Sequence, residues 1–281
     1  MSAAPIGIFD SGIGGLTVAR AVHRALPGES TIYVGDTARV PWGNKSPETV
    51  RRYAREIAQW LLGQRVKMIV IACNTATAHA LDDLRSWSPV PVIGVIEPGA
   101  RGAAAATVRG QVGVIGTAGT MVSHAYRRAL LAIRADLAVT EQPCPLFVPF
   151  VEEGWLDHRA VRLVAEEYLA PLRAARIDTL VLGCTHYPLL KTLIAEVMGG
   201  PAVLVDSADE TAREVAGTLN EAGLAAPAGA VPVRRWIATD DAERFSRVGA
   251  IFMGELPGPV EIIDPAQPAH SGSGERLEAD V

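Results

Sequence analysis

Three short motifs occur twice in this chain, in the same order and at a nearly constant offset. The pairs are residues 6–11 (IGIFDS) with 112–117 (VGVIGT) at 106 residues, 40–42 (VPW) with 148–150 (VPF) at 108, and Cys73 with Cys184 at 111. Such an offset indicates an internal duplication. We therefore predict two similar lobes that face each other, each contributing one cysteine to a shared cleft.

Apolar runs alternate with amphipathic segments along the chain. Apolar residues recur at intervals of three and four in residues 48–63 and 158–175, which predicts helices there. Strands are predicted near residues 6–9, 31–35, 68–72, 92–95, 112–115, 138–142, 179–183 and 202–205. Strands that alternate with helices form parallel sheets with right-handed crossovers. The predicted fold class is α/β, with two pseudo-symmetric lobes, each a mainly parallel sheet flanked by helices, and the active site between them.

The lobe boundaries are predicted from chain-breaking residues and from the strand pattern. The first lobe comprises residues 1–96 plus about 208–263, and the second comprises 97–207, with the boundary at Pro98 and Gly99. Residues 209–219 are predicted to form a helix, and 233–263 return to complete the first lobe. Residues 264–281 are rich in Pro, Gly, Ser and Glu and are predicted to be a disordered tail.

Composition excludes several classes of protein. The formal net charge is −5 without a block of Lys and Arg, so we expect no nucleic-acid partner. No apolar stretch approaches the ~18 residues of a membrane helix, so we expect no membrane partner. The amino terminus lacks the basic segment of a secretion signal, and three cysteines make a disulfide framework a poor interpretation. We therefore expect a cytoplasmic protein.

Cys73 and Cys184 each end an apolar run and precede small polar residues. This pattern predicts a buried parallel strand that ends where a helix begins, and open α/β sheets place their chemistry there. Unpaired N–H groups and the helix dipole lower the pKa of a thiol from about 8.5. We therefore predict lowered pKa values for both thiols, which would let them act as bases near neutral pH.

The segment DSGIGG from Asp10 follows a predicted strand and precedes a predicted helix. With Asp36 placed 21 positions after Gly15, it resembles a dinucleotide fingerprint. However, Thr17 stands where that pattern has its last glycine, and the Asp10 carboxylate would repel a pyrophosphate. A turn for a smaller anion, with Asp10 facing a cation or a thiol, fits better, and helix capping is the structural alternative for Asp10.

Other titratable residues have both functional and structural interpretations. His186 lies two residues after Cys184 at a strand end, which favours function over simple packing. His79 is interpreted as structural, and Cys144, between two prolines, as a buried inert thiol. A zinc site from Cys73, Cys184 and His186 lacks the close ligand pairs typical of zinc, so no metal is predicted.

Motifs spread from residue 6 to about 217 resemble the glutamate racemases of bacterial cell-wall synthesis. They are FDSGIGG from Phe9, YVGDT from Tyr33, ACNTAT from Ala72, IGVIEPGA from Ile93, VPFVE from Val148, LGCTHYPLL from Leu182 and DETAREV from Asp209. The resemblance implies an isomerase that interconverts L-glutamate and D-glutamate without a cofactor and supplies D-glutamate for peptidoglycan synthesis. It also implies a homodimer.

The resemblance further implies roles for individual residues. Cys73 deprotonates D-glutamate and Cys184 deprotonates L-glutamate, from opposite faces of the α-carbon. Asp10, Glu152 and His186 fall on auxiliary acid and base positions. The implied substrate contacts are Asp10, Ser11, Trp42, Gly43, Asn74, Thr75, Thr185 and His186. The family usually has tyrosine where this chain has Trp42, so we expect a different shape at that end of the pocket.

Racemisation needs a base on one face of the α-carbon and an acid on the other, which explains two thiols. Pyridoxal phosphate would need a lysine, and Lys45, Lys67 and Lys191 are not placed for a Schiff base, so no cofactor is predicted. Three alternatives remain open: a thiol hydrolase that uses Cys184 and His186, an amino-acid-binding module without catalysis, and an aspartate racemase of the same superfamily.

Overall fold

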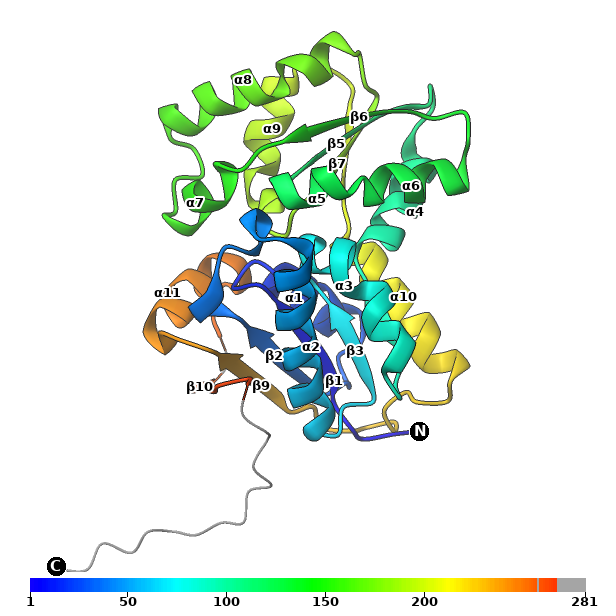
Figure 1. Cartoon of the computed structure of the whole chain (residues 1–281), viewed down its shortest axis with the longest axis vertical. Helices are drawn as coiled ribbons and strands as arrows, with labels where there is room; N and C mark the ends of the chain where they lie inside the picture. The colour runs from blue at the N-terminus through cyan, green and yellow to red at the C-terminus, as the bar shows by residue number, and fades with distance from the viewer. Residues whose placement is uncertain (257, 267–281) are drawn as a thin grey trace, which may run out of the picture.

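The protein contains two parallel β-sheets with helices on both faces of each (Figure 1). The computed structural model describes residues 1–256 and 258–266. One sheet has the order β10-β9-β2-β1-β3-β4 and the other β6-β5-β7-β8. The strands are β1 (Ile6–Asp10), β2 (Thr31–Gly35), β3 (Met68–Ile71), β4 (Val92–Gly94), β5 (Gln111–Gly116), β6 (Ala138–Pro143), β7 (Thr179–Gly183), β8 (Val203–Asp206), β9 (Arg234–Ala238) and β10 (Val260–Ile262). The predicted α/β class and all eight predicted strands are confirmed.

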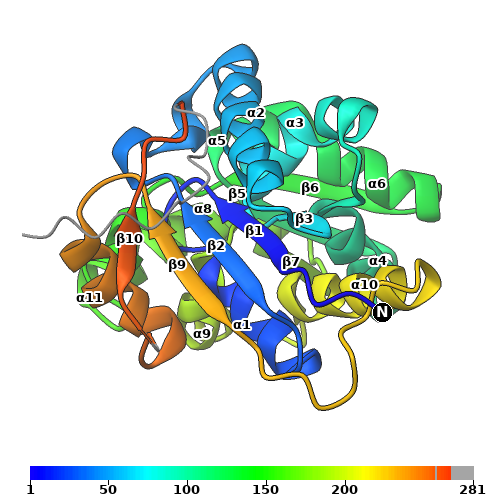
Figure 2. The ribbon, with the colours of Figure 1, turned by 90° about the horizontal axis from the view of Figure 1, so that it is seen from below.

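The two sheets repeat one strand order. β2-β1-β3-β4 in the first sheet corresponds to β6-β5-β7-β8 in the second, and every pairing is parallel. β1 and β5, which carry the first repeated motif, therefore occupy equivalent positions. β9 and β10 extend the first sheet beside β2, so the chain after residue 233 returns to that sheet as predicted (Figure 2).

Helices cover both faces of each sheet. They are α1 (Leu16–Ala25), α2 (Pro47–Gly63), α3 (Asn74–Trp87), α4 (Ile96–Ala106), α5 (Ala118–Ser123), α6 (Ala125–Ile133), α7 (Phe147–Glu152), α8 (Arg159–Ala174), α9 (Lys191–Met198), α10 (Ala208–Glu221) and α11 (Ala242–Met253), with short 3₁₀ turns η1 (Thr37–Arg39), η2 (Trp42–Asn44) and η3 (Tyr187–Leu190). α2, α8 and α10 match the predicted helices. α2 shows the local cause: the Ser46 side chain caps it by accepting from the Thr49 N–H, and Pro47 pre-sets the first turn.

Successive side chains of β1 lie on opposite faces of the first sheet, and both faces are buried. Ile6 and Ile8 in β1 pack with α1, α10 and α11, whereas Phe9 packs with α2 and α3. Figure 2 shows these two groups of helices on opposite sides of the sheet. In the second sheet, α4, α5 and α6 cover one face, and α8 and α9 cover the other. Strands covered on both faces become continuous apolar runs, which is why the sequence revealed them so clearly.

The chain passes between the sheets twice, through α4 and at the start of α10. Pro98 and Gly99, predicted to break the chain at the lobe boundary, lie in the first turn of α4 instead. Proline is tolerated there because a first-turn N–H has no partner within the helix. The exact lobe boundaries stay a prediction, and the predicted tail falls mostly outside the described residues. No helix in the described part of the chain is long and apolar enough to span a membrane.

Candidate active site

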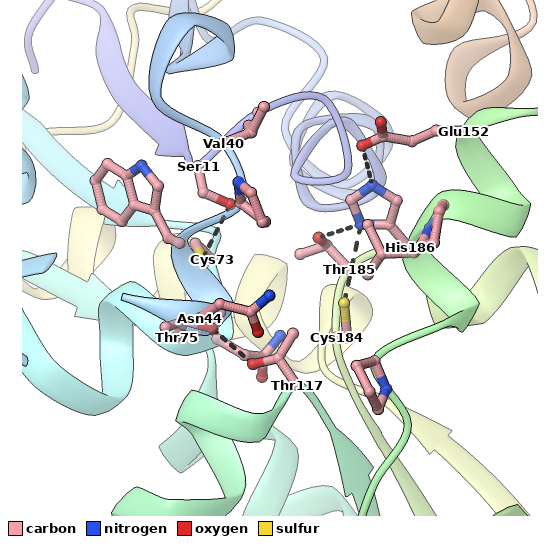
Figure 3. Close-up of a pocket in the computed structure, with 18 of the residues that line it drawn as sticks. Ser11, Val40, Asn44, Cys73, Thr75, Thr117, Glu152, Cys184, Thr185 and His186 are labelled. Atoms are coloured by element: carbon pink, nitrogen blue, oxygen red, sulfur yellow. Dashed lines mark hydrogen bonds and ion pairs between the residues drawn. The ribbon is translucent and has the colours of Figure 1, made fainter. Parts of the chain in front are cut away.

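A cavity of about 400 Å³ lies where the carboxyl ends of the two sheets face each other (Figure 3). Its lining comes from both halves of the chain. It brings together ten of the eleven predicted site residues: Ser11, Trp42, Gly43, Cys73, Asn74, Thr75, Glu152, Cys184, Thr185 and His186. The eleventh, Asp10, is 1% exposed and lies behind the Ser11–Gly12 part of the lining.

Cys73 is the amino-terminal cap of α3. Its Sγ accepts a hydrogen bond from the Ala76 N–H at 3.4 Å and lies 3.5 Å from Ser11 Oγ. Burial and the nearby carboxylate of Asp10 nevertheless raise the pKa of Cys73 to about 12. The predicted helix start is confirmed, but the predicted lowering of the Cys73 pKa is wrong. The loss of hydration outweighs the helix N–H groups.

Cys184 directly follows β7, as predicted, but no α-helix begins next to it. The 3₁₀ turn η3 starts three residues later, and α9 begins at Lys191. The proline in Tyr187–Leu190 supports this tight turn. The Sγ of Cys184 lies 3.8 Å from Nδ1 of His186 (Figure 3). The surroundings of the two thiols therefore differ, although the strands that carry them are equivalent.

His186 connects Cys184 to the ion pair of Glu152 and Arg244, whose side chains are 17% and 41% exposed. Its Nε2 lies 3.0 Å from Glu152 Oε1, and Arg244 Nη2 donates to Glu152 Oε2 at 3.0 Å. Burial opposes a charge on His186, but hydrogen bonds with Cys184 and Glu152 outweigh it and raise its pKa to about 10. Burial likewise opposes the charge of Glu152, yet His186 and Arg244 hold its pKa below the usual range.

Asp10 lies at the end of β1 on the Cys73 side. Gly12 N–H donates to its Oδ2 at 3.1 Å, whereas Oδ1 has no partner in the described part of the chain. Burial raises the pKa of Asp10, partly offset by the charge of His186 and by N–H groups of the glycine turn. The charge of Asp10 acts on Cys73, whose pKa it raises, and α1 begins at Leu16 without a side-chain cap from Asp10.

The glycines of the DSGIGG segment have a packing role. A Cβ at Gly15 would lie 2.5 Å from the Asp10 Cβ, and one at Gly14 would lie 2.4 Å from the His186 ring. Only glycine fits both places without displacing a site residue. Asp36, which completed the possible dinucleotide fingerprint, receives hydrogen bonds from Arg39, Trp42 and Thr239 and holds the loop that lines the cavity.

Trp42 is 1% exposed and its indole N–H donates to Asp36 Oδ2 at 3.0 Å. The hydrogen-bonding capacity of the indole is thereby used inside the loop, since Nε1–H is its single polar group. The adjacent Gly43 packs against Thr117, where a Cβ would lie 2.8 Å from the threonine Cβ. Trp42 thus shapes the loop, and Gly43 brings its backbone to the opposite lobe.

The lining also contains residues that were not predicted as site residues, among them Asn44, Thr117 and Arg244. Thr117 follows β5, and its Oγ1 lies 2.9 Å from Thr75 Oγ1 in α3. This hydrogen bond connects the two halves of the chain at the cavity lining. The position of Thr117 in the repeated motif, equivalent to Ser11, was the signal that could have found it. Arg244 lies in the amphipathic helix α11, whose sequence carries no such signal.

The remaining candidates lie outside the lining. His79 Nε2 is 3.1 Å from the Gly119 carbonyl, which is consistent with a structural role. Cys144 is fully buried with its pKa raised by burial, as expected of an inert thiol. All three cysteines are free, and the described residues contain no group of His, Cys, Asp and Glu that could hold a metal ion.

Known proteins resemble this chain over most of its length. A model described as Asp/Glu/Hydantoin racemase matches residues 7–215. A glutamate racemase of Geobacter metallireducens is 54% identical over 255 residues, which cover 91% of this chain and 94% of the relative. One from Mycobacterium tuberculosis is 48% identical over 265 residues, covering 94% and 97%.

Solved structures share the whole fold. A glutamate racemase isoform from Bacillus anthracis superposes with a TM-score of 0.91 at 39% identity, covering 95% of this chain and 99% of that one. A Francisella tularensis glutamate racemase in complex with D-glutamate gives 0.88 at 37% identity, covering 94% and 99%. Picrophilus torridus aspartate racemase shares the fold alone, with 17% identity and a TM-score of 0.54 over 78% of this chain. The chain belongs to the glutamate racemases of the Asp/Glu/hydantoin racemase family.

Proposed function

We propose that this protein interconverts L-glutamate and D-glutamate without a cofactor, using Cys73 and Cys184 as the two proton carriers. One observation carries the proposal: both thiols line a single cavity, from equivalent strands of two different sheets and from opposite sides (Figure 3). A substrate α-carbon between them would present one face to each thiol. The identity to glutamate racemases supports glutamate as the substrate.

The reaction in each direction is a proton removal on one face and a proton delivery on the other. In the D-to-L direction, the Cys73 thiolate takes the α-proton and the Cys184 thiol gives its own proton to the carbanion, and the reverse direction exchanges these roles. Asp10 assists Cys73, and His186 with Glu152 assists Cys184. The positive α-ammonium group of the substrate would favour the thiolate of Cys73, whose pKa burial and the Asp10 charge raise to about 12.

Substrate binding relies on polar groups that follow the carboxyl ends of the strands. The first N–H groups of α3 and the side chains of Asn74 and Thr75 suit a carboxylate, because helix amino termini attract anions. The full proposed set is Asp10, Ser11, Trp42, Gly43, Asn74, Thr75, Thr185 and His186. Trp42 would contribute ring contacts, since its N–H is bonded to Asp36.

The proposal extends to the biological setting that the sequence resemblance implies. D-glutamate produced in the cytoplasm would feed peptidoglycan synthesis, and the enzyme would act as a homodimer. The division into lobes of residues 1–96 with about 208–263, and 97–207, belongs to the same proposal. Each lobe would then carry one of the two thiols.

A stereochemical assay of the purified protein tests the proposal. L-glutamate, D-glutamate and both enantiomers of aspartate are incubated separately without added cofactor, and enantiomeric composition is followed by chiral chromatography. Either glutamate enantiomer should reach an equal mixture, with aspartate converted far more slowly. Faster conversion of aspartate would favour the aspartate racemase alternative, and no conversion of glutamate would overturn the proposal.

A further inference from the structure

A buried tyrosine, Tyr126, links the two sheets close to both cysteines. It lies on α6 beside the four-stranded sheet and is 0% exposed. Its hydroxyl donates a 2.7 Å hydrogen bond to Oδ1 of Asn74, which directly follows Cys73 and begins α3 beside the six-stranded sheet. The bond therefore connects an element of one half of the molecule to the residue next to the thiol of the other half.

The hydrogen bond from Tyr126 fixes the orientation of the Asn74 amide. An asparagine side chain has an acceptor at one end and two N–H donors at the other. With Oδ1 engaged by Tyr126, Nδ2 is the free end, and it is buried without a partner in the described part of the chain. Asn74 lines the cavity, so Nδ2 is a donor that a bound carboxylate can satisfy.

The aromatic ring of Tyr126 contacts the strand that carries Cys184. A Cβ at Gly183, the residue before Cys184, would lie 3.0 Å from Cε2 of Tyr126. Glycine at this position lets the ring pack directly on the backbone of β7. One side chain thus contacts the residue after Cys73 through its hydroxyl and the residue before Cys184 through its ring.

Tyr126 also lies where the chain passes between the sheets. A Cβ at Gly99 in α4 would lie 3.2 Å from the Tyr126 hydroxyl oxygen, and Ser207, which precedes α10, forms a side-chain hydrogen bond with that hydroxyl. α4 and α10 are the two crossing points. The Tyr126 hydroxyl therefore lies against α4 and the start of α10, which connect the two sheets, and also against Asn74 of the active site.

We propose that Tyr126 is a positioning residue for substrate binding: its hydroxyl orients Asn74 so that the amide N–H donors face the substrate carboxylate. The inference rests on the proposed racemisation and goes beyond it, because Tyr126 is not part of the cavity lining. Since both enantiomers carry the same carboxylate, loss of the hydroxyl raises KM for both. The thiols and their auxiliary groups are unchanged, so kcat changes much less.

Tyr126→Phe tests the inference with a matched control. We expect KM to rise about tenfold for both enantiomers, the factor that corresponds to about 1.4 kcal/mol of binding energy. Tyr187→Phe is the control, because Tyr187 is equally buried and its hydroxyl donates a bond of the same 2.7 Å length to the Cys144 carbonyl. That variant should keep the wild-type KM, and circular dichroism checks that both variants are folded.

A double-mutant cycle separates action through Asn74 from a general structural effect. In an Asn74→Ala background, Tyr126→Phe should add no further rise in KM. Asn74→Asp provides a test that keeps Tyr126 intact, because aspartate accepts from the tyrosine hydroxyl but offers no donor to the cavity. KM should rise in this variant at least as much as in Tyr126→Phe. An unchanged KM in Tyr126→Phe or in Asn74→Asp, or a full additional loss in the double variant, would overturn the inference. A wild-type protein without racemase activity would instead defeat the proposed function.

Discussion

His186 and Glu152 form a 3.0 Å contact between Nε2 and Oε1 at the edge of the cavity. The imidazole presents its other nitrogen, Nδ1, toward Cys184 Sγ. Glu152 thereby sets the orientation of the ring and stabilises its positive charge, with Arg244 holding the second carboxylate oxygen. This arrangement makes the protonation of His186 depend on a residue that does not contact the thiol.

Glu152→Gln should move the alkaline limb of the pH–rate profile to lower pH. The pKa of His186 is about 10 in the folded protein, raised above 6.5 because its bonds with Cys184 and Glu152 outweigh burial. A neutral amide removes part of that stabilisation, so the ring loses its proton at a lower pH. The measurement is turnover of L-glutamate between about pH 6 and 10. Glu153→Gln, at an exposed neighbouring position, is the control and should keep the wild-type profile.

The raised pKa of His186 also predicts how the stability of the fold depends on pH. Because the folded-state value lies above 6.5, charged His186 stabilises the fold fully below about pH 6.5, and this contribution is lost as pH rises through about 10. Glu152→Gln lowers the folded-state pKa of His186. The stabilising contribution of the charged ring should therefore be lost at a lower pH than in the wild type. An alkaline limb at the same pH in both proteins would show that Glu152 does not control the ring.

Asp10→Asn should lower the pKa of Cys73. Burial raises this pKa most, and the Asp10 carboxylate raises it further, so removal of the charge takes away the second effect. Alkylation of Cys73 by iodoacetamide, followed by mass spectrometry as a function of pH, reports the change. Turnover of D-glutamate should nevertheless fall more than that of L-glutamate, because Asp10 no longer assists Cys73. Equal proportional losses in both directions, with unchanged KM, would refute side-specific assistance.

Cys73→Ala and Cys184→Ala should each abolish racemisation while the protein stays folded. Each face of the α-carbon needs its own proton carrier, and one thiol cannot reach both. The control is Cys144→Ala, since Cys144 is fully buried outside the cavity lining and should be dispensable for chemistry. Chiral chromatography of glutamate gives the rates. Near-normal racemisation by Cys73→Ala or by Cys184→Ala would contradict the two-base mechanism.

Trp42→Phe should lower the free energy of unfolding by about 1–3 kcal/mol, because a buried hydrogen bond to Asp36 is lost. Urea denaturation measures the difference. Trp155→Phe is the control, since Trp155 is 45% exposed and packs on Phe150 at the surface, and should change stability little. Equal stability of the two variants would mean that Asp36 is satisfied by Arg39 and Thr239 alone.

The sheets and their duplication could be predicted from the sequence because buried parallel strands leave long apolar runs. The match between residues 6–11 and 112–117 placed β1 and β5 in equivalent positions, which the shared strand order confirms. Chain-breaking residues were less informative. Pro98 and Gly99 predicted an interruption, but a helix accepts proline in its first turn, and Gly99 makes room for Tyr126 and Ser207.

The electrostatics of the site could not be predicted from local patterns. The helix after Cys73 was found, but the burial and the Asp10 charge that reverse the expected shift depend on tertiary packing. Arg244 and Tyr126 were missed for the same reason. Each acts on a residue more than fifty positions away in the chain, and neither lies in a motif that marks chemistry.

The central claim, that two thiols exchange protons with opposite faces of one α-carbon, is tested most directly by racemisation in deuterated water. Starting from either enantiomer of glutamate, the product should carry deuterium at the α-carbon from its first appearance, because the donating thiol has exchanged with solvent. The remaining substrate should stay protiated at early times, because the accepting thiol does not return a solvent deuteron to the same face. Rapid appearance of deuterium in the unconverted substrate would contradict the account.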